Sequence, residues 1–138
     1  MALFGFSILM LLKMLFAAFN GILFTQTGLD KLMNYKGNLN YFTDHFKNSP
    51  LASTVGILLP VIMIIETTAG LTSLSGLVML LAGDEILAEV IASTGMLFGA
   101  IAITCLFMGQ RLTKDYAGAA SLVPYFLMTA AGLALYLV

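Results

Sequence analysis

The stretch 51–82, LASTVGILLPVIMIIETTAGLTSLSGLVMLLA, decides the fold of this chain. It contains no Lys, Arg or Asp, and its only acid is Glu66. Because about 20 apolar residues in a helix cross the hydrocarbon core of a bilayer, the stretch predicts a membrane-spanning helix. Further apolar runs cover about 3–29, 86–108 and 117–138. We therefore expect an all-α membrane protein, a single four-transmembrane-helix bundle over 1–138, with helices at about 3–33, 51–82, 85–109 and 117–138.

The composition of the 138 residues agrees with a membrane location. Hydrophobic residues make up 60% and charged residues 9%, with a mean hydropathy of +1.01. A soluble domain has about 25% charged residues, so this chain lacks the polar surface that a water-soluble globule needs. Its net charge of −1 argues against nucleic acid as a partner, because no basic face is available for phosphates. The lipid bilayer is the partner that the composition predicts.

Metal and redox ligands are scarce in the sequence. Cys105 and His45 are the only residues of their types. One cysteine cannot form an intramolecular disulfide, and this pair cannot supply the usual zinc, iron–sulfur or bis-histidine haem ligands. We expect no metal and no cofactor bound by the chain itself, whereas a quinone or lipid could occupy the seams between helices.

The segment 34–49 is the only sizeable connection. Its apolar residues Leu39, Phe42 and Phe46 recur at helical spacing, which predicts a short amphipathic interfacial helix between helices 1 and 2; a plain hydrophilic loop is the alternative. Ser49 and Pro50 then have the residue types of a helix start.

Other boundaries are marked by single residues. Gly83 and Asp84 have the types of a helix stop followed by a cap. Pro60 and Pro124 lie inside apolar runs, where neighbouring helices can accommodate a kink. The first apolar run lacks a basic segment before it and is longer than a signal-peptide core, so we expect a retained helix.

The basic residues lie mainly in two of the connections. The end opposite the termini carries Lys31, Lys36, Lys47, Arg111 and Lys114, whereas the loop at the terminal end has only acids. The positive-inside rule therefore predicts that the loops 34–49 and 109–118 face the cytoplasm and that both termini lie outside it.

Polar residues within the spans are the candidate site. Lys13, Asn20, Thr27 and Lys31 project within roughly 40° of one another on helix 1, at about 100° per residue, and should face protein. Glu66 is the acid deepest in an apolar run and should contact Lys31, directly or through Gln26 or water. We interpret this contact as an ion pair between helices 1 and 2; the functional alternative is a proton relay or ligand anchor. Lys13 either joins the buried stripe or extends to the interface, and we favour the interface.

Small residues indicate where helices approach closely. Gly95 and Gly99 form a GxxxG motif in helix 3, and Gly70 and Ser73 lie in helix 2. Such residues allow backbones to touch in lipid, so we expect packing faces within the bundle, with a dimer interface as the alternative.

These polar and small residues give the chain a family resemblance. The segment Gly28-Leu29-Asp30-Lys31-Leu32 resembles the G-x-x-K-L signature of the DoxX-like membrane proteins. The aromatic pair Tyr41-Phe42 before Ser49-Pro50, and Glu66-Thr67-Thr68-Ala69-Gly70, resemble that family's aromatic segment and its E-x-x-x-G in helix 2. The four-helix layout is similar over nearly the whole chain. The polar run Thr72-Ser73-Leu74-Ser75 departs from the aliphatic pattern of the family.

The resemblance implies a small protein of the bacterial inner membrane. Relatives include the small subunit of thiosulfate:quinone oxidoreductase and partners in other membrane oxidoreductase complexes. Thiol motifs that some relatives carry are missing here. We therefore expect a non-catalytic accessory subunit that meets larger membrane subunits and has no redox centre of its own. The alternatives are an assembly factor or structural scaffold and, less favoured, a proton-coupled transporter or enzyme that uses Glu66.

Overall fold

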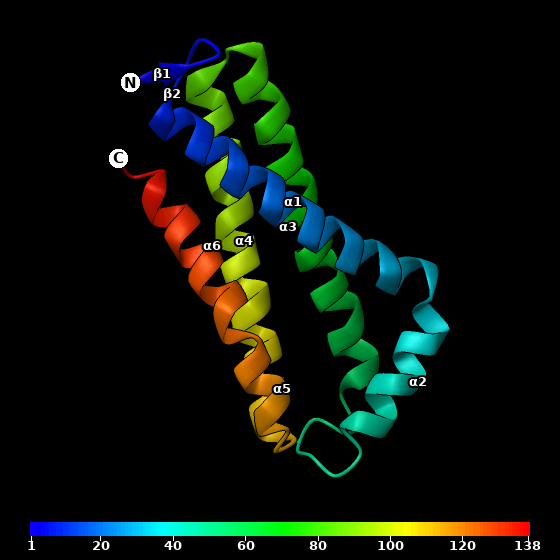
Figure 1. Ribbon diagram of the computed structural model, residues 1–138. Coiled ribbons are helices and arrows are strands. Elements are labelled where there is room, and N and C mark those ends of the chain that lie inside the picture. Colours follow the sequence, from blue (N-terminus) through cyan, green and yellow to red (C-terminus); the bar gives the residue numbers. More distant parts are fainter.

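The computed structural model describes residues 1–138 and is almost entirely helical (Figure 1). A hairpin of two short strands, β1 (Ala2–Leu3) and β2 (Phe6–Ser7), comes first. The helices that follow are α1 (Ile8–Met33), α2 (Tyr35–His45), α3 (Val55–Ala82), α4 (Glu85–Leu112), α5 (Tyr116–Ser121) and α6 (Val123–Leu135). Four are long and apolar enough to cross a membrane: α1, α3, α4, and α5 with α6 as one span, Tyr116–Leu135. The expected four-helix bundle, with a short helix between its first two spans, is confirmed.

The spans are not all parallel in the bundle. Helices α3 and α4 run side by side in opposite directions, α6 lies along α4, and α1 crosses α3 and α4 obliquely (Figure 1). Both termini and the α3–α4 turn lie at one end, which we call the terminal end. Helix α2 and the α4–α5 connection lie at the other, which we call the loop end (Figure 1).

Two predicted helix starts are wrong. Helix α1 begins at Ile8 rather than near residue 3, because Phe4 (φ 55°) and Gly5 (φ 83°) turn the chain back into the hairpin. Ser7 then caps α1, accepting a hydrogen bond from Met10 N at 3.1 Å. Helix α3 begins at Val55 rather than near residue 51.

The late start of α3 has a local cause. Ser49 Oγ donates to Phe46 O at 2.8 Å and accepts from Leu51 N at 3.1 Å, so this hydroxyl closes a turn instead of capping a helix. Tight turns continue, with Ala52 N bonded to Ser49 O and Thr54 N bonded to Leu51 O. The α-helical bonding pattern follows only after these turns.

The remaining boundaries are partly as predicted. Gly83 ends α3 in the left-handed conformation (φ 91°), as its type predicts, but the Asp84 side chain makes no capping bond to α4. Helix α4 continues to Leu112, beyond the predicted end at 109. The last span is interrupted at Leu122, so Pro124 lies in the first turn of α6, where its missing N–H costs nothing.

The small residues pack inside the bundle. Gly70 of α3 lies against the backbone of Thr25 in α1, and Gly95 of α4 lies against Ser73 of α3. Gly99 of α4 faces the side chains of Phe24 and Asn20 in α1. All of these glycines are buried, and they lie where helices of the same chain approach one another.

Gly76 provides a direct test of this packing. A methyl group at Gly76 would lie 2.6 Å from Cβ and 2.8 Å from Cα of Ala92, so Gly76→Ala should force α3 and α4 apart. Overpacking of this kind costs about 1–3 kcal/mol, and we expect a lower midpoint of thermal unfolding in detergent. Gly56→Ala is the matched control, because nothing lies within 4 Å of that position. An equal midpoint for both variants would show that the α3–α4 seam is not closely packed.

Candidate functional site

Helix α1 turns its polar stripe toward the other helices. Lys13, Asn20 and Lys31 are buried, although each lies on a span that is otherwise largely apolar. Thr27, the fourth member, is half-buried and donates to Phe24 O of its own helix at 3.2 Å. Three of the four polar groups thus face protein, as expected for polar side chains in a membrane span.

The predicted contact between Lys31 and Glu66 is present. Lys31 Nζ lies 2.8 Å from Glu66 Oε2, and the carboxylate side chain is only 2% exposed. Gly28, one turn before Lys31, lies against the backbone of Thr67, which brings α1 and α3 close enough for the pair to form. Gln26 is exposed, and of the three expected forms of the contact, direct, through Gln26 or through water, the direct one is present. The pair is direct because the two backbones already touch beside it.

Asn20 joins three helices at the middle of α1. Its side-chain amide Nδ2 donates to Ser73 Oγ of α3 at 2.7 Å and to Gly95 O of α4 at 3.2 Å. Both partners lie at small-residue positions predicted to be packing sites. Ser73 belongs to the polar run of α3, so one hydroxyl of that run serves as a hydrogen-bond acceptor between helices.

Lys13 forms a second ion pair at the terminal end. Its Nζ lies 2.7 Å from Glu89 Oε1 of α4 and 3.3 Å from Val138 O, and only 4% of its side chain is exposed. The favoured expectation that Lys13 extends to the interface is therefore wrong. The side chain points into the bundle, where Glu89 Oε1 and Val138 O both lie within reach of its ammonium group.

Tyr136 closes this end of the bundle. Its hydroxyl donates to Lys13 O at 2.9 Å, and Lys13 Nζ lies 5.6 Å from the centre of its ring. Burial, and next the negative charge of Glu89, raise the pKa of Tyr136 to about 12. The hydroxyl therefore stays protonated and remains a donor at physiological pH.

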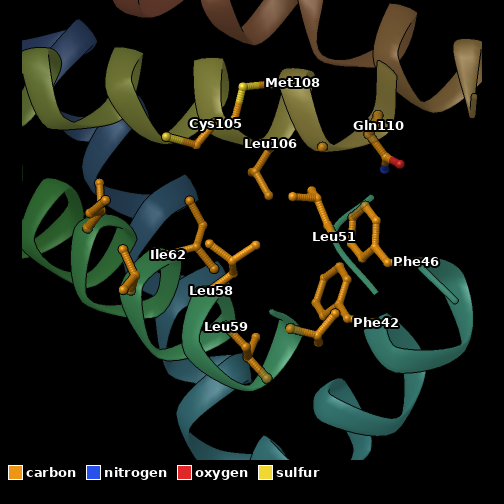
Figure 2. Close-up of a pocket in the computed structure, with 14 residues that line it drawn as sticks. Phe42, Phe46, Leu51, Leu58, Leu59, Ile62, Cys105, Leu106, Met108 and Gln110 are labelled. Carbon is orange, nitrogen blue, oxygen red and sulfur yellow. The ribbon is translucent and has the colours of Figure 1, made fainter. Parts of the chain in front are cut away.

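The loop end contains an apolar pocket, which Figure 2 shows in close-up. Its volume is about 180 Å³, and 12 of its 14 lining residues are hydrophobic. Leu58 and Ile62 of α3 face Cys105 and Leu106 of α4 across the pocket, and α2 covers one end with Phe42 and the adjoining Phe46 (Figure 2). The two rings stack with centroids 6.0 Å apart. This pocket lies in a seam between helices, and a quinone or lipid in it stays a prediction.

A polar network lies beside this pocket. His45 Nε2 is 2.7 Å from Gln110 Oε1, a pocket-lining amide, and 3.6 Å from Asp115 Oδ2. Thr113 Oγ1 also donates to the backbone oxygen of His45 at 2.8 Å. These contacts fasten the end of α2 to the end of α4. They place the only histidine of the chain at the polar rim of an apolar pocket.

Sequence reasoning missed part of this arrangement. Glu89 stands near the start of a span, where an acid is ordinary, so only its contact with Lys13 singles it out. The His45–Gln110 contact joins residues that are far apart in the chain, and no local pattern indicates it. The aromatic spacing of Phe42 and Phe46 was the one available signal, and it predicts the helix but not the pocket that the rings cover.

Chemically, the buried charges form closed pairs, whereas the pocket can accept an apolar molecule. Comparisons with known protein families, curated proteins and solved structures give no match to the chain. The resemblance to the DoxX-like proteins therefore rests on the sequence motifs alone, and two residues of those motifs, Lys31 and Glu66, meet in the structure.

The Lys31–Glu66 pair can be tested by a double-mutant cycle on thermal stability in detergent. Removing one partner of a buried pair typically costs about 3–5 kcal/mol, because the other charge is left alone in an apolar site. We expect Glu66→Ala to destabilise the chain more than Glu66→Ala combined with Lys31→Met. Additive effects of the two single changes would rule out the interaction.

The Lys13–Glu89 pair serves as the internal comparison. The Glu89 side chain is 31% exposed, so solvent or lipid headgroups can screen its charge. The coupling energy between Lys13→Met and Glu89→Ala should therefore be smaller than that between Lys31→Met and Glu66→Ala. A larger coupling at Lys13 would show that burial does not set the strength of these pairs.

Proposed function

We propose that this chain is a non-catalytic accessory subunit of a larger oxidoreductase or respiratory complex in a bacterial inner membrane, of the DoxX-like kind. The observation that carries the proposal is the Lys31–Glu66 pair. The two charged residues of the resembling motifs lie 2.8 Å apart and hold α1 against α3. A carboxylate fixed in this way stabilises the bundle, whereas a proton relay needs further titratable groups in reach.

The other buried polar groups support the same role. Lys13 is paired with Glu89, and Asn20 bonds to both α3 and α4. The buried charges are therefore paired within the bundle, and its glycines are used in its own packing. These features suit a rigid membrane support better than an enzyme that works through Glu66.

A larger subunit would meet this chain mainly within the bilayer. The outward side of α1 carries large exposed apolar residues, among them Leu15, Phe19 and Ile22. Such a surface suits either lipid or another apolar helix. The short connections outside the spans offer little further area, so we place the partner along the spans and at the loop end.

Native purification tests this role. We expect the tagged full chain, solubilised from its own membranes in a mild detergent, to carry a larger membrane subunit at a fixed ratio, with the redox centre in that partner. Mass spectrometry gives the ratio of the two subunits. Absorbance of the separated chain shows whether it carries a redox centre. Gly76→Val is the control, because a disrupted α3–α4 seam should lose the partner.

Three outcomes would contradict the accessory role. A lone bundle, or substoichiometric and varied partners, would favour the scaffold or assembly factor. A stoichiometric haem or flavin spectrum from this chain by itself would contradict the expectation that it has no redox centre.

We also propose that the loop end faces the cytoplasm. The basic residues Lys36, Lys47, Arg111 and Lys114 lie at or beside its connections, opposite both termini. In a chain with Cys105→Ala, an impermeant thiol reagent applied from the periplasm should label Asp84→Cys and spare Asn38→Cys. Asp84 is exposed and Asn38 is half-buried in the fold, and each position is a control for the other. Labelling of Asn38→Cys from the periplasm would reverse the orientation.

A further inference from the structure

The pocket at the loop end has one apolar part and one polar part. Along α3 and α4 its walls are aliphatic side chains, including Leu58, Ile62 and Leu106. An apolar cavity of about 150 Å³ stays free of water and takes up apolar molecules, so a pocket of about 180 Å³ favours a hydrocarbon occupant. Because α3 and α4 are membrane spans, lipid acyl chains can reach these walls directly.

Apart from the Cys105 thiol, Gln110 has the only polar side chain in the wall of the pocket. Its Oε1 is taken by His45 at 2.7 Å, which leaves the amide NH₂ group as a hydrogen-bond donor at this end. Phe46 lies over Gly109, where an added Cβ would come within 3.3 Å of the ring. The end of α2 thus closes the pocket on the side where the donor lies.

Three cations lie next to residues of this end in the sequence. Lys47 follows Phe46 directly, and Arg111 and Lys114 flank the Thr113 hydroxyl that holds His45. The two nearby acids are already engaged: Asp44 with Lys47 at 3.0 Å, and Asp115 with His45 and with Gly118 N. Arg111 and Lys114 have no carboxylate partner, and Arg111 lies 4.5 Å from the centre of the Tyr116 ring. With three cations against two acids, this end of the chain carries a net positive charge.

We infer that this pocket binds an anionic phospholipid, with one acyl chain between α3 and α4 and the phosphate beside Arg111 and Lys114. The apolar walls match the hydrocarbon, the Gln110 amide can donate to an ester carbonyl, and the two free cations match the phosphate charge. Basic side chains near the surface of an anionic leaflet each favour such a lipid by about fivefold. The inference stands independently of the proposed subunit role, because it concerns the isolated chain in a membrane.

The chain contains no tryptophan, so a single introduced indole gives an unambiguous signal. We would place Phe46→Trp in the full chain, reconstitute it in phosphatidylcholine vesicles, and titrate in brominated phosphatidylglycerol or brominated phosphatidylcholine. Ile57→Trp is the control: it lies on the same part of α3, is 71% exposed, and does not line the pocket. Bromine quenches the indole only when the acyl chain is in contact with it.

We expect Phe46→Trp to be quenched at a several-fold lower mole fraction of brominated phosphatidylglycerol than of brominated phosphatidylcholine. Ile57→Trp should respond equally to both lipids. Adding Arg111→Gln and Lys114→Gln should abolish the preference for phosphatidylglycerol at Phe46→Trp. The preference that is lost would be up to about 25-fold if the two cations act separately. These positions are exposed, and the contact of Arg111 with the Tyr116 ring is the only one lost, so thermal stability should change little.

Two results would overturn the inference. Equal quenching of Phe46→Trp by both brominated lipids would show that the pocket does not select an anionic headgroup. Loss of that quenching when a small mole fraction of a long-chain isoprenoid quinone is added would assign the pocket to a neutral carbonyl-bearing ligand instead.

Discussion

A charged side chain inside a bilayer must find its partner in the protein, because no water is there to solvate it. Helix α1 carries two buried cations, and each meets an acid from a different helix: Lys13 meets Glu89 of α4, and Lys31 meets Glu66 of α3. Between them, Asn20 bonds to both α3 and α4. Three polar contacts along one helix fix both its rotation about its own axis and its position along that axis. The oblique path of α1 across the bundle is the path on which all three can be made together.

Short polar contacts require close backbones, and the glycines provide them. Gly28 lies against Thr67 beside the Lys31–Glu66 pair, and Gly95 lies against Ser73 beside the Asn20 contacts. Lipid gives helices no hydrophobic reason to associate, so neither close packing nor hydrogen bonding alone explains a stable bundle. Here the two act at the same places. A side chain larger than glycine at these positions would separate the helices and break the polar contact as well.

The long-range order of the fold was largely predictable from the sequence, because the bilayer imposes span length and apolarity that a single chain reveals. The Lys31–Glu66 contact was predictable too, since Glu66 is the only acid deep in an apolar run and Lys31 ends the preceding span. The burial of Lys13 was not predictable, because its distance from the end of the span suits an interfacial lysine as well as a buried one. Only its contact with Glu89 distinguishes the two positions. The helix start predicted at Ser49 was wrong for a local reason. A serine hydroxyl can close a turn or cap a helix, and the choice depends on backbone geometry that residue type does not specify.

The size of the side chains changes along the α3–α4 seam, and this change accounts for the pocket. Toward the terminal end the facing residues are small, as where Gly76 meets Ala92, so the two helices touch. Toward the loop end they are large, with Leu58 and Ile62 opposite Leu106, and the helices stand apart. The α2 aromatic rings cover the pocket without filling it, and the His45 contacts hold that cover in place. The two ends of the bundle therefore have different roles: the terminal end closes the structure through Lys13, Glu89 and Tyr136, and the loop end keeps a bounded apolar space open beside free positive charge.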